Sequence, residues 1–202
     1  MIRTFLALEI PAFIRRELSQ TIREFQAEVP RGIKWVKDEN LHITLQFVGD
    51  TKEEDIPEII DFLDNIFLEL PELEFFKPEI QIIPGRNPRL IWVNAKTENK
   101  EIFKAVTRIK NKLQHLDYEL DKKPLKFHVT LGRIKKRLPD FFIAKALSKK
   151  INYEKFKVSE ATFYRSILQP EGPIYEKIKV FRLGQKDKKI EIFEKILENN
   201  KE

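Results

Sequence analysis

The chain has 202 residues and a net charge of +6, from 38 Lys and Arg against 32 Asp and Glu. It has no cysteine, which excludes disulfides, thiolate nucleophiles and Cys-ligated zinc. With only three histidines, a His-rich metal cage is not expected, and we expect no metal and no cofactor. No apolar run is long enough to span a membrane and no signal-peptide pattern begins the chain, so we expect a cytoplasmic protein without a membrane partner. The basic charge is compatible with a polyanionic partner such as nucleic acid.

Hydrophobic periodicity and turn residues predict the elements of the first half of the chain. In chain order we expect a strand, a helix, two strands, a helix and two strands, over residues 2–10, 11–29, 33–36, 41–48, 51–67, 79–83 and 89–96. Thr51 and Glu54 match a capping box at the start of the second helix. Pro71 and Pro78 are expected to bound a loop, and residues 84–88 to form a turn.

The second half is predicted to mix helices and strands in the same way. We expect a helix, a strand, a short helix, two strands and a final amphipathic helix, over residues 100–116, 125–134, 139–150, 155–168, 175–183 and 186–202. Strands that occur in pairs joined by short turns indicate an α+β fold with antiparallel sheets. No linker separates the halves, so we expect two pseudo-symmetric lobes facing a central cleft within residues 1–184, with helices outside and 185–202 as a helical extension.

The most informative feature is a repeated motif. Residues 41–45 read LHITL and residues 127–131 read FHVTL, so the two motif histidines, His42 and His128, lie 86 residues apart. In an extended strand, alternation places each His and Thr on one face and the apolar residues on the other. In the first copy the predicted apolar face holds Leu41, Ile43, Leu45 and Phe47. Lobes related by a two-fold axis would bring both His–Thr pairs together across the cleft.

Two imidazoles that titrate near neutrality can act as a general base and a general acid. Two threonine hydroxyls can donate hydrogen bonds to an anion, and no carboxylate cluster accompanies the motifs. Such a set suits metal-free displacement at phosphorus, for which the strained 2′,3′-cyclic phosphate of RNA is a suitable substrate. One His-x-Thr in a strand is usually only a half-exposed strand. Two copies with the same apolar flanks are far more specific, whereas His115 lies in a helical stretch without a Thr companion and is expected at the surface.

Four blocks in this order resemble the 2H phosphoesterase superfamily. They are RTFLALEIP, IKWVKDENLHITLQFVGD, FHVTLGR and SILQPEGPIYEKIKVFRLG, and the resemblance covers roughly residues 1–184. The resemblance is greatest to the bacterial and archaeal RNA 2′,3′-cyclic phosphodiesterases, also called 2′-5′ RNA ligases. It implies hydrolysis of a terminal 2′,3′-cyclic phosphate to a 2′-phosphate. It also implies that His42 is the proton donor to the 3′ oxygen, that His128 is the proton acceptor, and that Thr44 and Thr130 bind phosphate.

The family also has a basic residue shortly after the second motif, which here is Arg133. Strict alternation would bury Arg133 beside Leu131, but a bulge at Gly132 would direct it into the cleft as a phosphate contact. Trp35 and Phe5 are candidates for the base pocket, although an ordinary core role is the more common one for such aromatics.

Three alternative functions remain open from the sequence. The same groups could join a 2′,3′-cyclic phosphate to a 5′-hydroxyl, the protein could be a non-catalytic RNA-binding module, or the substrate could be a small cyclic nucleotide. The expected partner is RNA with 2′,3′-cyclic phosphate ends, with fragments of transfer RNA as a candidate source, and we expect a monomer.

Overall fold

The computed structural model describes residues 1–83, 90–121 and 123–185. The strands in this part of the chain are β1 (Ile2–Glu9), β2 (Ile33–Trp35), β3 (His42–Thr51), β4 (Leu73–Ile82), β5 (Leu90–Lys96), β6 (His128–Ile134), β7 (Lys155–Val158), β8 (Glu160–Ile167) and β9 (Ile174–Arg182). The α-helices are α1 (Ala12–Glu28), α2 (Ile56–Glu69), α3 (Glu101–His115) and α4 (Asp140–Ser148), and short 3₁₀ turns cover Asp38–Asn40 and Glu53–Asp55.

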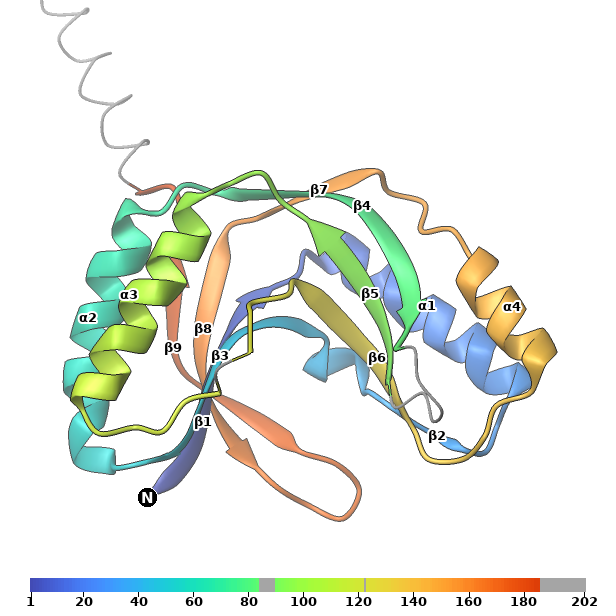
Figure 1. The fold of residues 1–202 in the computed structure, drawn as a ribbon, viewed down its shortest axis with the longest axis horizontal. Helices are drawn as coiled ribbons and strands as arrows, with labels where there is room; N and C mark the ends of the chain where they lie inside the picture. Colours follow the sequence, from blue (N-terminus) through green and yellow to red (C-terminus); the bar gives the residue numbers. More distant parts are fainter. Residues whose placement is uncertain (84–89, 122, 186–202) are drawn as a thin grey trace, which may run out of the picture.

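All the strands belong to one antiparallel sheet with the order β7-β4-β5-β6-β3-β1-β8-β9, and β2 also pairs with β6 (Figure 1). β7 lies at one edge and β8 lies second from the other edge, yet only Ser159 separates them in the chain. The sheet must therefore curl until its two ends approach each other. The predicted α+β fold with antiparallel strands is confirmed, and the two halves are joined into one sheet where β3 meets β6.

The two halves of the sheet are related by an approximate two-fold axis that passes between β3 and β6. These strands pair at Ile43 and Val129, the central residues of the two motifs. On one side β3 pairs with β1, and on the other β6 pairs with β5, with the same register shift at the same place in each pair. The two motifs are thus placed side by side at the centre of the curled sheet, with equivalent neighbours.

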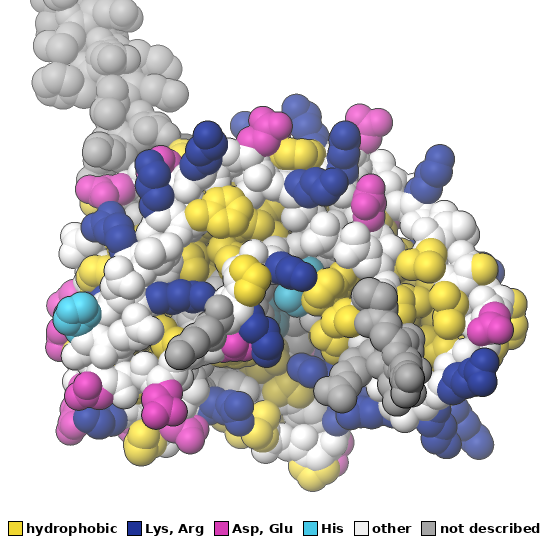
Figure 2. Space-filling view, viewed as in Figure 1, with side chains coloured by type: hydrophobic (Ala, Val, Ile, Leu, Met, Phe, Trp, Pro, Cys, Tyr) yellow, Lys and Arg dark blue, Asp and Glu magenta, His cyan; other side chains and the backbone are white. Residues whose placement is uncertain are grey.

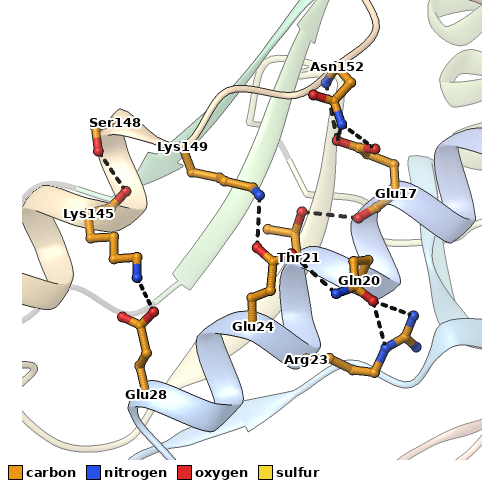
Figure 3. A network of polar contacts seen from close by, with 10 residues as sticks. All are labelled: Glu17, Gln20, Thr21, Arg23, Glu24, Glu28, Lys145, Ser148, Lys149 and Asn152. Carbon is orange, nitrogen blue, oxygen red and sulfur yellow. Dashed lines mark hydrogen bonds and ion pairs between the residues drawn. The ribbon is translucent and has the colours of Figure 1, made fainter.

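The helices pack on the two halves of this sheet. α2 and α3 cover the half formed by β3, β1, β8 and β9, and α1 and α4 cover the other half (Figure 1). Each helix buries the apolar residues that recur at helical spacing, for example Ile14, Leu18, Ile22 and Phe25 of α1. A polar network joins α1 to α4 and the residues after it (Figure 3). It includes Lys149–Glu24 at 2.8 Å, the Lys145–Glu28 pair and the hydrogen bonds from Asn152 to Glu17.

The four predicted helices before residue 186 are present, but the predicted capping box is wrong. α2 begins after the 3₁₀ turn at Glu53–Asp55, with no side-chain hydrogen bond at its cap. Thr51 instead ends β3, where its hydroxyl lies 2.6 Å from the hydroxyl of Thr4 and donates to the Gly49 carbonyl. The hydroxyl is therefore used in the pairing of β1 with β3 and is not available to cap the helix.

Two strand predictions also need correction. The expected loop between Pro71 and Pro78 is mostly strand, because a bulge with Lys77 at φ 49° lets β4 continue through Pro78. The single strand expected over 155–168 is two strands, which pair with opposite ends of the sheet. The predicted turn at 84–88 and helix at 186–202 lie outside the described residues.

Candidate active site

A cavity of about 820 Å³ opens on the sheet where β3 and β6 meet. It is lined by both motif histidines and both motif threonines, His42, Thr44, His128 and Thr130. Figure 2 shows histidine side chains at the hollowed centre of this face, with Lys and Arg side chains around it. Because Ile43 is opposite Val129 in antiparallel strands, His42 lies opposite Thr130 and Thr44 lies opposite His128. The structure brings the two His–Thr pairs together in one cavity, as predicted.

The predicted strands begin at residues 41 and 125, whereas in the structure each motif histidine is the first residue of its strand, and a hydrogen bond fixes its ring. The Nδ1 of His42 donates to the carbonyl of Asn40 at 2.7 Å, and the Nδ1 of His128 donates to the carbonyl of Lys126 at 2.8 Å. A carbonyl only accepts, so each neutral ring carries its proton on Nδ1 and has Nε2 unprotonated, with a lone pair that can accept a proton. At His42 this Nε2 lies 3.0 Å from the hydroxyl of Thr44.

Aromatic rings hold both imidazoles in place. The ring of Phe5 lies 5.1 Å from that of His42, and the ring of Trp92 lies 4.3 Å from that of His128. Tyr175 packs edge-on against His42 at 5.5 Å and also lines the cavity. Rings packed in this way remove rotamer freedom from the imidazoles, which keeps each Nε2 aimed in one direction.

A bulge follows each motif threonine and redirects the next side chains. In β3 the register shift falls at Leu45, and in β6 it falls at Leu131. As a result Arg133 lines the cavity, as a bulge at the neighbouring glycine predicts. The corresponding residue after the first motif is Phe47. It was expected on the buried face, but the bulge leaves it 60% exposed at the cavity, so that prediction is wrong.

Burial is the main influence on both imidazoles. It lowers the pKa of His42 from 6.5 to about 4, against the opposing effects of the Asn40 hydrogen bond and the Glu9 carboxylate. Burial also lowers the pKa of His128, against the opposing effect of the Lys126 carbonyl hydrogen bond, and the Lys126 cation acts in the same direction as burial. Both rings are therefore mainly neutral near pH 7 in the unliganded protein. An anion bound between them would favour the imidazolium form of either ring.

The cavity wall is strongly basic. Among the described residues its lining includes seven Lys and Arg side chains, Lys34, Lys37, Lys110, Lys123, Lys126, Arg133 and Lys135, against Asp121 and Glu171. Within the described residues no group of three His, Asp or Glu side chains lies close enough to hold a metal ion. The arrangement offers two imidazoles and several cations to a bound phosphate.

The two aromatic candidates for a base pocket have different positions. Trp35 lines the cavity, with its ring packed against Gly132 and Phe25. Phe5 is 2% exposed behind His42 and is not among the lining residues, so it supports the imidazole instead of facing the cavity. His115 is exposed at the end of α3, as predicted.

Four residues near the motif histidines were not predicted to be there from the sequence: Trp92, Tyr175, Phe47 and Glu9. Trp92 and Tyr175 lie on strands far from the motifs in the chain, and only the pairing of those strands brings them to the cavity. Tyr175 belongs to one of the four blocks that carry the family resemblance, and that block is the available signal.

Comparison with known proteins gives the same internal division. The family model described as LigT like Phosphoesterase matches the chain twice, over residues 8–92 and 93–175, with one His-x-Thr motif in each segment. The chain belongs to the LigT-like phosphoesterase family. The resemblance inferred from the motifs is thereby confirmed.

Relatives in this family match nearly the whole chain. An RNA 2′,3′-cyclic phosphodiesterase of Methanocaldococcus jannaschii is 36% identical over 184 residues, which is 88% of this chain and 98% of the relative. One of Archaeoglobus fulgidus is 32% identical over 182 residues, covering 89% and 99%.

Solved structures share the LigT-like fold. A crystal structure of a Thermus thermophilus protein has a TM-score of 0.76 at 23% identity and covers 90% of this chain and 98% of its own. Escherichia coli LigT in complex with 3′-AMP has a TM-score of 0.72 at 20% identity, covering 91% of this chain and 99% of its own.

No helix in the described part of the chain is both long and apolar enough to cross a membrane.

Proposed function

We propose that this protein is an RNA 2′,3′-cyclic phosphodiesterase that hydrolyses the terminal cyclic phosphate to a 2′-phosphate. The observation that carries the proposal is the meeting of the two His-x-Thr motifs side by side in one basic cavity. Relatives with the same activity in their names, at 36% and 32% identity over almost the whole chain, support it.

In this mechanism the two imidazoles exchange protons with the two oxygens in line with phosphorus. His128 uses its free Nε2 lone pair to take a proton from the attacking water. His42 gives a proton from Nε2 to the departing 3′ oxygen, whose bond to phosphorus breaks. The product carries a 2′-phosphate. His128 then releases its proton to solvent, and His42 takes up a proton when the next phosphate binds.

The phosphate oxygens need partners during this displacement. Thr44, Thr130 and Arg133 are the groups we assign to them, because all three line the cavity around the imidazoles. The bound anion also favours the imidazolium form of His42, so substrate binding itself prepares the acid. Trp35 is assigned to the part of the cavity wall that contacts the base of the terminal nucleotide. Phe5 is assigned a supporting position behind His42.

The product decides between this mechanism and its alternatives. Adenosine 2′,3′-cyclic phosphate is incubated with the protein in excess EDTA, and the product is identified by phosphorus NMR against 2′- and 3′-AMP standards. We expect 2′-AMP and no loss of rate with EDTA. A 3′-AMP product would reverse the assigned roles of His42 and His128, and a rate restored only by a divalent ion would overturn the metal-free mechanism.

The physiological partner is RNA that ends in a 2′,3′-cyclic phosphate, with transfer RNA fragments as the proposed source and a monomer as the acting species. A 5′-hydroxyl RNA added to the same assay tests ligation, since a joined product in place of hydrolysis would favour the reverse reaction. Light scattering of the purified protein tests the monomer.

A further inference from the structure

The two halves of the sheet differ at one pair of equivalent positions, which lie beside the two motif histidines. In β1, Glu9 is directly opposite His42, and in β5, Asn94 is directly opposite His128. Opposite residues in antiparallel strands present their side chains on the same face, with Cβ atoms about 4.5–5.5 Å apart. Glu9 and Asn94 therefore occupy equivalent positions beside the two imidazoles, and only one of them has a charge.

Glu9 is held as a buried carboxylate. Its side chain is 11% exposed, and its oxygens accept hydrogen bonds from Thr162 at 2.8 Å and from the hydroxyl of Tyr164. Lys177 lies 3.1 Å from the same carboxylate and Arg15 lies 3.3 Å from it. These contacts hold the pKa of Glu9 below its ordinary value against the effect of burial, so the carboxylate is ionised at neutral pH.

We infer that Glu9 is a positioning residue: it holds a negative charge beside His42, where the other half of the sheet has the neutral Asn94, and so favours the protonated form of His42 that the proposed mechanism needs as its acid. The inference rests on the proposed phosphodiesterase function, and it supplies a physical reason for roles that the symmetric motifs alone do not distinguish.

The groups around His42 act in both directions: burial, Arg15 and His128 oppose its protonation, whereas Glu9 and the Asn40 hydrogen bond favour it. The charged and titratable groups come from five elements: Glu9 of β1, Arg15 of α1, His128 of β6, Tyr164 of β8, and Tyr175 and Lys177 of β9. Arg15 and Lys177 are paired with Glu9, so loss of this carboxylate would leave both cations without it. His128 has no carboxylate opposite it in β5; burial and the Lys126 cation disfavour its protonation, and only the hydrogen bond to the Lys126 carbonyl favours it.

The test is Glu9→Gln, which keeps the shape and removes the charge. The pH–rate profile on adenosine 2′,3′-cyclic phosphate should lose about tenfold on its alkaline side, where His42 must still hold a proton, and little on its acidic side. Glu9→Asp should recover most of that loss. The matched control is Glu176→Gln, which removes a surface carboxylate of β9 paired with Arg165 and should leave the profile unchanged.

Asn94→Asp is the converse variant and tests the same idea without touching Glu9. It places a carboxylate beside His128, so the rate should fall on the acidic side of the profile, where His128 must be free of its proton. An NMR titration of the histidines in the unliganded protein gives an independent measurement: the pKa of His42 should fall in Glu9→Gln, and that of His128 should rise in Asn94→Asp.

Two outcomes would overturn the inference. One is an equal loss of rate at every pH in Glu9→Gln with an unchanged His42 titration, which would make Glu9 a structural residue only. The other is an Asn94→Asp profile identical to that of the wild type. If the wild-type protein did not hydrolyse the cyclic phosphate, the proposed function would fail, whereas the NMR titrations would still decide the effect of Glu9.

Discussion

The imidazoles of His42 and His128 are prepared for proton transfer by the same device, a hydrogen bond from Nδ1 to a carbonyl two residues earlier. This bond fixes the tautomer, and the packed rings of Phe5 and Trp92 fix the orientation. The chemistry therefore depends on where the strand begins as much as on the identity of the residue. An imidazole placed one residue later would point to the opposite face of the sheet.

Replacing either motif histidine by Ala should lower kcat on the cyclic phosphate by on the order of 10²–10⁴-fold, the usual contribution of a positioned acid or base. The double variant should be little worse than the poorer single one, because the pair acts as a unit. Thr44→Ala and Thr130→Ala should cost less, about tenfold to a hundredfold, since each removes one hydrogen bond to a charged group. His115→Ala is the control and should be silent. Near-full activity in a folded His42→Ala or His128→Ala variant would contradict the two-histidine mechanism.

Burial of His42 also makes the stability of the protein depend on pH. The unfolded chain takes up a proton at this residue as the pH falls below about 6.5, but the folded protein does so only near pH 4. The contribution of His42 to the free energy of unfolding is therefore complete above pH 7 and decreases as the pH falls from about 6.5 to 4.

Urea denaturation of wild type and His42→Gln across this pH range measures the effect. The free energy of unfolding of the wild type should decline more steeply toward pH 4 than that of the variant, while His115→Gln should follow the wild type. Parallel curves for wild type and His42→Gln would show that His42 titrates near its ordinary pKa in the folded state.

At the scale of the elements, the bulges in β3 and β6 decide which side chains reach the cavity. Each lies directly after a motif threonine, and together they bring Phe47 and Arg133 to the cavity side. In β6 the bulge is followed by Gly132, where an added Cβ would lie 2.7 Å from Cγ2 of Ile33 and 2.9 Å from Cε3 of Trp35. Glycine is required at this position because β2 packs closely over the bulge.

Gly132→Ala should therefore destabilise the protein by about 1–3 kcal/mol, the usual cost of overpacking, and displace Trp35 from the cavity wall. The chain has two tryptophans, so a Trp92→Phe background leaves Trp35 as the only indole. A shifted emission spectrum and a lower melting temperature in Trp92→Phe/Gly132→Ala, relative to Trp92→Phe alone, are the expected results. An unchanged spectrum would mean that Ile33 and not Trp35 yields to the new methyl group.

The elements differ in how well their sequences predict them. The helices were predicted correctly because a helix depends on local periodicity, such as that of Ile14, Leu18 and Ile22 in α1. Phe47 was placed on the wrong face because a bulge in β3 depends on its pairing with β1, which is not a local property. Trp92 was missed for the same reason, since only the register of β5 on β6 brings it to His128. The motif residues themselves were predictable because each copy repeats the same pattern.

At the scale of the whole molecule, the excess positive charge is concentrated around the site. The net charge of the chain is +6, and the cavity lining alone has seven basic and two acidic side chains among the described residues. Lys34 and Arg133 are opposite each other in β2 and β6, and Lys135, which follows β6, also lines the cavity. An RNA longer than one nucleotide would therefore place its further phosphates near several of these cations.

This distribution predicts that substrate length and salt act together. For an RNA oligonucleotide with a 2′,3′-cyclic phosphate end, kcat/KM should fall steeply between about 50 and 200 mM salt, by roughly 0.7 in logarithmic slope for each phosphate contacted. For adenosine 2′,3′-cyclic phosphate the fall should be shallow, because it has no second phosphate. Lys135→Ala should reduce the slope for the oligonucleotide and leave the mononucleotide rate unchanged, whereas Lys104→Ala, an exposed lysine of α3 that is not among the cavity-lining residues, should change neither. Equal salt slopes for the two substrates would mean that only the terminal phosphate is bound by the protein, and that the basic wall does not serve the rest of the RNA.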